Sequence, residues 1–107
     1  MSARREKIEA MLKLEPQDQF LRYGLASEYR SEGRLEESLA LYRGLMADQE
    51  PHVPSFLIGA QLLVELDRIA EARAALRDGI EIARMQGNAH AAGEMGELLA
   101  SLGSLGE

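Results

Sequence analysis

One six-residue stretch occurs twice in this chain of 107 residues, and the copies lie 34 positions apart. Gly33-Arg34-Leu35-Glu36-Glu37-Ser38 returns as Asp67-Arg68-Ile69-Ala70-Glu71-Ala72. Both copies lie between segments whose apolar residues recur every three or four positions, which indicates amphipathic helices. Each copy is therefore predicted to be a turn and the first residues of a second helix. A helix–turn–helix unit that recurs with this period is typical of a stacked helical array.

The apolar periodicity predicts six helices separated by short breaks. Glu15-Pro16 ends the first helix, because the residue before a proline is pushed out of the helical conformation. Gly33 can supply the left-handed residue that stops the second helix. Pro54 is well tolerated in a first helical turn, so the fourth helix is expected to begin near it. The predicted ranges are 2–14, 17 or 18 to 31, 35–48, 54–66, 69–85 and 89–102, and residues 103–107 are expected to fray.

Two of the predicted helices have informative faces. Residues 54–66 are apolar nearly all round, which indicates a helix covered on several sides in the middle of an array. The helix at 69–85 is rich in Ala and carries a row of charged residues that are expected to face solvent. This row consists of Arg73, Arg77, Asp78, Glu81 and Arg84.

The composition limits the class of protein. Apolar residues make up 46% of the chain and charged residues 28%, an ordinary balance for one soluble domain. Aromatic residues are only 5% and Trp is absent, so the core must be built from Leu, Ile, Ala and Met. Such residues suit close-packed helices better than sheets.

The charge and the absence of cysteine exclude several functions. With 18 acidic and 12 basic residues the net charge is −6, which disfavours nucleic acid and anionic membranes as partners. The lack of Cys excludes thiolate metal sites and thiol catalysis. No apolar run approaches the length of a membrane span, and the charged start is not followed by the apolar run of a signal peptide. The cytoplasm is the expected location.

The repeat extends well beyond the two turns. Alignment of residues 20–48 with 54–82 pairs Ala26 with Ala60 and Ser38 with Ala72. A small residue in the middle of a first helix lets the second helix approach closely, and a small residue early in the second helix accepts the bulk opposite it. Identical residues also pair outside these positions, namely Arg34 with Arg68, Glu37 with Glu71, Ala40 with Ala74, and Arg43 with Arg77.

These residues resemble the tetratricopeptide repeat family, which has the same period. Leu25-Ala26-x-x-Tyr29 looks like the family's Leu-Gly-x-x-Tyr, and Met95-Gly96-x-x-Leu99 is a looser version. The chain departs from the family where Arg22 replaces a bulky aromatic residue, and where Leu45 and Gly79 replace a small Ala. A generic helical bundle is the alternative. Further matches are the turn glycine Gly33, Glu37-Ser38, the aromatic Tyr42, and the closing prolines Pro16 and Pro51.

The resemblance implies an all-α, right-handed superhelical array of antiparallel helix pairs. It predicts a single domain over residues 1–107 with four parts. These are an N-terminal half-unit helix (1–16), a first repeat (17–50), a second repeat (51–86) and a C-terminal capping helix (87–107).

The resemblance also implies a function, because first helices in this family line a concave groove that holds a peptide or a partner helix. The chain is accordingly expected to be a non-catalytic adaptor or scaffold for another protein, with no cofactor. For Phe20 and Leu57, packing between helices is an equal alternative, whereas Tyr23 and Arg30 are favoured as contacts because tyrosine and arginine are enriched at interfaces. The groove residues carried over by alignment are Phe20, Tyr23, Ser27, Arg30, Leu57, Gln61, Val64, His90, Gly93 and Glu97.

Two other readings of the sequence are open. The first and last helices lack partners in a regular array, so the chain could instead be a homo-oligomerisation module, such as a homodimer, that uses these helices. His90, Glu94 and Glu97 are spaced to share a helix face and could bind a metal, although no second histidine supports them. No catalytic triad or phosphate-binding loop is indicated. His52, between two prolines, is expected to be exposed.

Overall fold

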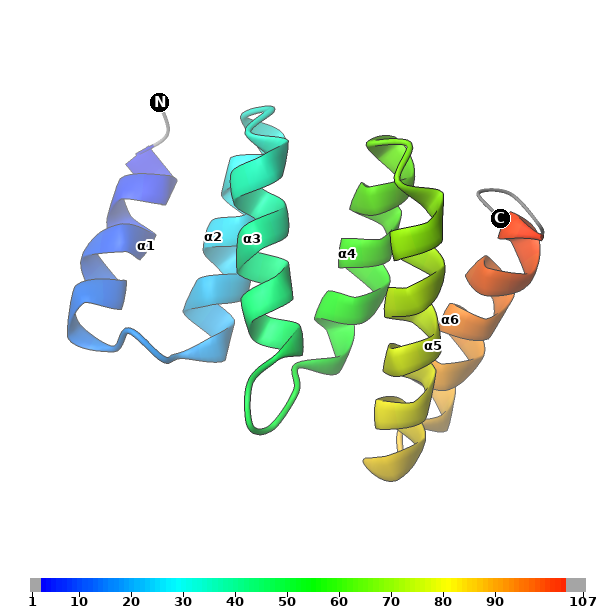
Figure 1. Cartoon of the computed structure of the whole chain (residues 1–107). Coiled ribbons are helices and arrows are strands. Elements are labelled where there is room, and N and C mark those ends of the chain that lie inside the picture. Colours follow the sequence, from blue (N-terminus) through cyan, green and yellow to red (C-terminus); the bar gives the residue numbers. More distant parts are fainter. Residues whose placement is uncertain (1–2, 104–107) are drawn as a thin grey trace.

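The computed structural model describes residues 3–103, which form six α-helices and no strand (Figure 1). The all-α fold predicted from the sequence is therefore confirmed. The predicted helix start at Ser2 falls outside the described residues, and so does the fraying predicted for residues 103–107, apart from Gly103. The helices are α1 (Ala3–Leu14), α2 (Gln19–Ser31), α3 (Leu35–Met46), α4 (Val53–Glu65), α5 (Ile69–Met85) and α6 (Ala89–Leu102).

Each helix contacts the next one along the chain, and α4 also contacts α6. In Figure 1, α3 lies in front of α2, and α5 lies in front of α4 and α6. The helices α2, α4 and α6 thus form one layer, and α3 and α5 form a second layer against it. None of the helices within residues 3–103 is long and apolar enough to cross a membrane.

The repeated stretch forms the turn between paired helices, as predicted. Gly33 and Asp67 both have positive φ angles, 78° and 59°. The residue after each donates its N–H to a carbonyl five positions earlier, Arg34 to Tyr29 and Arg68 to Leu63, both over 2.8 Å. These hydrogen bonds close the preceding helix by the usual left-handed ending, which Asp tolerates better than most residues other than glycine.

The third helix is two residues shorter than predicted. It ends at Met46 instead of Asp48, and beyond this end the Asp48 carboxylate is held by α2. Arg22 Nη1 donates to Asp48 Oδ2 over 2.6 Å, and Gln19 Nε2 donates to the same oxygen over 2.9 Å. These hydrogen bonds, from Arg22 above all, lower the pKa of Asp48. Arg22, where the family has a bulky aromatic residue, thus joins α2 to the end of α3 by an ion pair.

Small residues lie where paired helices meet, as the alignment predicts. Ala26 and Ser38 in the first pair, and Ala60 and Ala72 in the second, have no exposed surface. Ser38 Oγ donates a hydrogen bond of 2.7 Å to the carbonyl oxygen of Ala26. A side chain this short reaches the opposite backbone only when the helices approach closely. The surrounding core includes Leu39, Tyr42, Leu45, Phe56, Leu62, Leu63, Leu76 and Met95.

Gly79 in α5 permits a second close approach. A Cβ atom added to it would lie 2.5 Å from Phe56 Cβ in α4 and 2.6 Å from Met95 Sδ in α6. The absence of the usual Ala at this position therefore has a packing reason.

The sequence prediction is wrong for one residue of the charged row on α5. Arg73 is only 2% exposed and donates a hydrogen bond to the carbonyl oxygen of Gly103. It is covered because α6 packs on α5, a contact that the pattern within α5 alone does not indicate. The other four residues of the row, Arg77, Asp78, Glu81 and Arg84, are exposed as predicted.

Gly79→Ala is expected to destabilise the fold although alanine is the better helix former. The new methyl group must displace Phe56, and overpacking of this kind costs about 1–3 kcal/mol. Because three atoms, Phe56 Cβ and Cγ and Met95 Sδ, would lie 2.5–2.8 Å from the added Cβ, we expect a cost of about 2 kcal/mol, which leaves a net loss of about 1 kcal/mol after the gain in helix propensity of about 1 kcal/mol. Thermal unfolding followed by circular dichroism should show Tm lowered by about 4–8 °C.

The matched control for this prediction is Gly93→Ala in α6, where an added Cβ has no neighbour within 4 Å. Here only the gain in helix propensity acts, so Tm should rise. Equal Tm changes in the two variants would contradict the packing role of Gly79.

Candidate binding surfaces

A cavity of about 300 Å³ lies between the helices of the first layer, and we call it the α2/α4/α6 cavity. Most of its wall is apolar, and its polar groups come from α6 and the turn before it. This combination is typical of sites that accept a side chain from a ligand or partner. The lining residues are Tyr23, Val53, Pro54, Leu57, Ile58, Asn88, His90, Ala91, Glu94 and Met95.

Tyr23 is held in this cavity by two other rings. Its ring meets that of Tyr42 edge-on, with centroids 5.8 Å apart, and that of His52 at a tilt, with centroids 4.9 Å apart. The side chain is half-buried, and this burial raises the pKa of the hydroxyl. Tyr23 therefore presents a positioned aromatic surface to the cavity.

His52 was predicted to be exposed, and this prediction is wrong. The residue is half-buried because its ring packs on Tyr23 and its Nδ1 lies 2.8 Å from Ser55 Oγ. Burial lowers the pKa of the imidazole, since the charged form is poorly solvated there.

Three of the predicted groove residues, one from each first-layer helix, line the same cavity: Tyr23, Leu57 and His90. Arg30 lies elsewhere on α2 and forms an ion pair with Glu65 of α4. Phe20 is 82% exposed and lies outside the cavity. The remaining predicted residues are also not among the lining residues: Ser27, Gln61, Gly93 and Glu97 are exposed and Val64 is half-buried.

The polar residues of α6 are well exposed. His90 Nε2 lies 3.4 Å from Glu94 Oε1, and the His90 side chain is 88% exposed. Among residues 3–103 no group of three or more His, Asp or Glu side chains is arranged to hold a metal ion. These residues can offer hydrogen bonds and charge to a ligand in the cavity.

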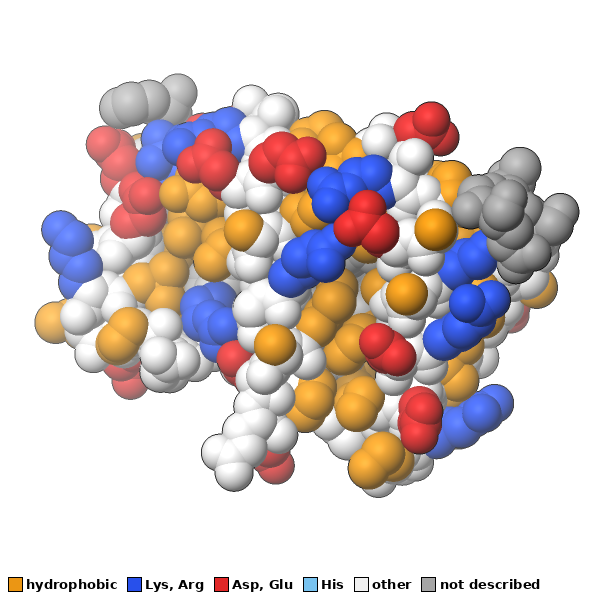
Figure 2. All heavy atoms as spheres, in the orientation of Figure 1, with side chains coloured by type: hydrophobic (Ala, Val, Ile, Leu, Met, Phe, Trp, Pro, Cys, Tyr) orange, Lys and Arg blue, Asp and Glu red, His pale blue; other side chains and the backbone are white. Residues whose placement is uncertain are grey.

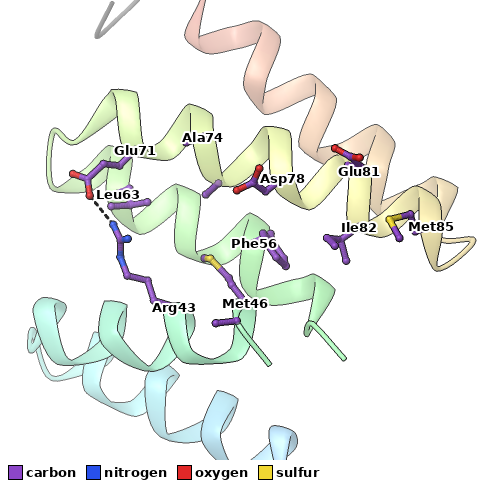
Figure 3. Close-up of a pocket in the computed structure, with 12 residues that line it drawn as sticks. Arg43, Met46, Phe56, Leu63, Glu71, Ala74, Asp78, Glu81, Ile82 and Met85 are labelled. Atoms are coloured by element: carbon purple, nitrogen blue, oxygen red, sulfur yellow. Dashed lines mark hydrogen bonds and ion pairs between the residues drawn. The ribbon is translucent and has the colours of Figure 1, made fainter. Parts of the chain in front are cut away.

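A larger pocket of about 500 Å³ opens between the second helices, and we call it the α3/α5 pocket (Figure 3). Its interior is apolar, with Met46 of α3 and Phe56 of α4 facing Ile82 and Met85 of α5. In Figure 2, hydrophobic side chains gather between α3 and α5 below a cluster of charged ones. The other lining residues are Arg43, Ala47, Leu63, Glu71, Ala74, Ala75, Asp78 and Glu81.

The rim of the α3/α5 pocket has a neutralised end and an acidic end. At one end Arg43 Nη2 lies 2.6 Å from Glu71 Oε1, and Arg68 also contacts Glu71, whose pKa is lowered chiefly by the hydrogen bond from Arg68. At the other end, neither Asp78 nor Glu81 forms an ion pair with any residue in the described range. This end can attract a cation.

The α3/α5 pocket is not among the sites predicted from the sequence. Asp78 and Glu81 are predicted to lie on a solvent-facing row, and Ile82 and Met85 share that face of α5. The spacing of these four residues was the available signal. The space itself depends on how far α3 stands from α5, which no pattern within one helix indicates.

The half-buried His52 predicts a loss of stability between pH 7.5 and pH 5. Its folded pKa lies below the unfolded value of about 6.5, so the unfolded state takes up the proton first. The stabilisation is complete above pH 6.5 and is lost as the pH falls through the folded pKa. Tm should therefore fall over this range.

His52→Gln should remove most of this fall in Tm, whereas His90→Gln, a change at an exposed position, should leave it in place. The carboxylates with lowered pKa, such as Asp48, lose their contribution only below about pH 4.5, outside this window. A wild-type Tm that is flat from pH 7.5 to pH 5 would contradict the prediction.

Comparison with known proteins shows which solved structures resemble this architecture. No protein-family model and no curated protein matches the chain. A solution NMR structure of a tetratricopeptide repeat domain protein from Salinibacter ruber is similar with a TM-score of 0.79 and 29% sequence identity, over 84% of this chain and 91% of that one. A crystal structure of a tetratricopeptide repeat domain protein from the same organism gives 0.72 and 28%, over 79% and 94%. With its six described helices and its repeated turns, this chain is a tetratricopeptide-repeat-like protein.

Proposed function

We propose that this chain is a non-catalytic protein-interaction module whose α2/α4/α6 cavity receives an apolar side chain of a partner peptide or helix. The tetratricopeptide-repeat likeness suggests protein interaction in general terms. The observation that carries the finer proposal is that Tyr23, Leu57 and His90 line one cavity. They come from three successive first helices, and Tyr23 and Leu57 occupy equivalent positions of the repeat.

The lining of the cavity defines the partner that fits it. Tyr23 and Leu57 offer an aromatic face and an aliphatic wall, while His90 and Glu94 stand at the polar side. A large apolar side chain followed by a hydrogen-bonding group matches this arrangement. Arg30 is engaged by Glu65, so recognition of a partner carboxylate is not part of the proposal.

Self-association through the terminal helices is the second candidate, and α1 is the terminal helix that favours it. Met11 is 41% exposed and Leu14 is 84% exposed, both unusually high for large apolar residues of a helix. The exposed residues of α6 are instead small or polar, as at Gly93, Glu97 and Ser101.

The cytoplasmic location stays a prediction.

Leu57→Arg is expected to abolish peptide capture by the α2/α4/α6 cavity. Peptides selected from a random phage-displayed library on the wild-type chain serve as the probe, and fluorescence anisotropy measures their affinity. The arginine fills the cavity and places a charge on its apolar wall, so Kd should rise at least tenfold, a typical loss at a binding hot spot.

Ala70→Arg is the matched control, because Ala70 is exposed on α5 and lines neither cavity. It adds the same side chain and should leave Kd unchanged. The cavity assignment would be wrong if the two variants bound the selected peptides equally well and both kept the wild-type circular dichroism spectrum.

A further inference from the structure

The outer face of α1 carries a charged and apolar stripe that no described residue covers. Lys7, Met11 and Leu14 follow one another at i, i+4 and i+7, so they lie on one side of the helix. All three are exposed, and Lys7 forms no ion pair with a residue in the described range. The opposite face of α1 is engaged, since Arg5 on that face pairs with Glu32.

The α3/α5 pocket carries a stripe with the same spacing and the opposite charge. Asp78, Ile82 and Met85 follow one another at i, i+4 and i+7 on α5, and all three line the pocket. Met85 is 77% exposed, and the large apolar residues Met11 and Leu14 of α1 are exposed as well. Behind this stripe, Met46 and Phe56 form the apolar interior (Figure 3).

The two stripes are complementary along their whole length. Each spans eight residues, about 10 Å of helix. With the helices running in the same direction, Lys7 meets Asp78, while Met11 and Leu14 meet Ile82 and Met85. Burial of the exposed Met11, Leu14 and Met85, together with the half-buried Ile82, supplies the attraction, and the opposite charges fix the register.

We propose that the occupant of the α3/α5 pocket is α1 of a second copy of this chain. This inference goes beyond groove binding, because the α3/α5 pocket and the α2/α4/α6 cavity share no lining residue. It is also narrower than self-association through both terminal helices, since α6 takes no part. Charge complementarity identifies the occupant. Asp78 and Glu81 at the pocket form no ion pair in the described range, and Lys7 on α1 forms none either.

The contact is heterologous, because α1 of one copy meets a different surface of the next. Each contact leaves one α1 and one α3/α5 pocket free at its two ends. Such an interface produces rings or open chains of copies instead of a closed symmetric dimer.

The test uses two full-length variants, each with one surface removed. Leu14→Glu removes the apolar end of the α1 stripe, and Ala74→Arg fills the pocket from an exposed position on its wall. In sedimentation velocity the wild type should increase in mass with concentration, and each variant alone should stay monomeric. An equimolar mixture of the two should form a 1:1 dimer and nothing larger, because only one intact α1 and one intact pocket remain.

Several outcomes would overturn the proposal. A wild type that stays monomeric at all accessible concentrations removes it, as does a mixture of the two variants that does not associate. Ala100→Arg, an exposed change on α6, is the control and should associate like the wild type. Loss of association in Ala100→Arg would assign the contact to α6 and reject the proposed pair of surfaces. Circular dichroism establishes that each variant is folded.

The register is tested separately by exchange of charges. Lys7→Glu and Asp78→Lys should each weaken association at least threefold, because like charges then face each other. Both changes in one chain restore opposite charges at every contact, so association should return to the wild-type level. A double variant as weak as the two single ones would reject the pairing of Lys7 with Asp78.

Discussion

The close approach of paired helices at small residues is the constraint on which the rest of this structure depends. Ser38 reaches the backbone carbonyl of Ala26 from the neighbouring helix, a contact that a larger residue at either position would prevent. The second pair meets at Ala60 and Ala72, which have no exposed surface. Gly79 allows a close approach of the same kind, because α5 lies against both α4 and α6. The bulky core residues then fill the space around these contacts, as close packing requires.

The repeat accounts for the scaffold, and residues that depart from it account for the surfaces. Arg34 and Arg68 form equivalent ion pairs with Glu37 and Glu71 at the two turns, but such exposed pairs contribute little to stability. In contrast, Tyr23 is replaced by Leu57 in the second unit, and only Tyr23 stacks on His52. The conformation of the turns is shared between units, whereas the chemistry of the cavity differs from helix to helix.

Helix positions and turns could be predicted because they depend on residues close together in the sequence. The left-handed residues Gly33 and Asp67, for example, lie directly after an apolar periodic segment. The same local reasoning failed for Arg73, which α6 covers, and for His52, which packs on a ring from α2. Register within the repeat brought Tyr23 and Leu57 to one cavity, and His90 joins them from a different position of the third first helix. The α3/α5 pocket stayed hidden because it arises from the space between two helices of different units.

The two surfaces have a combined consequence because they are formed by different layers. The α3/α5 pocket, where we propose that a neighbouring α1 lies, shares no lining residue with the α2/α4/α6 cavity. An assembly joined through α1 would therefore present one open cavity per copy, at fixed spacing. A partner with several matching segments would bind such an assembly far more tightly than a single copy, since each further contact is intramolecular. Self-association would then set the avidity of partner binding, and α1, which supplies none of the residues lining that cavity, would control it.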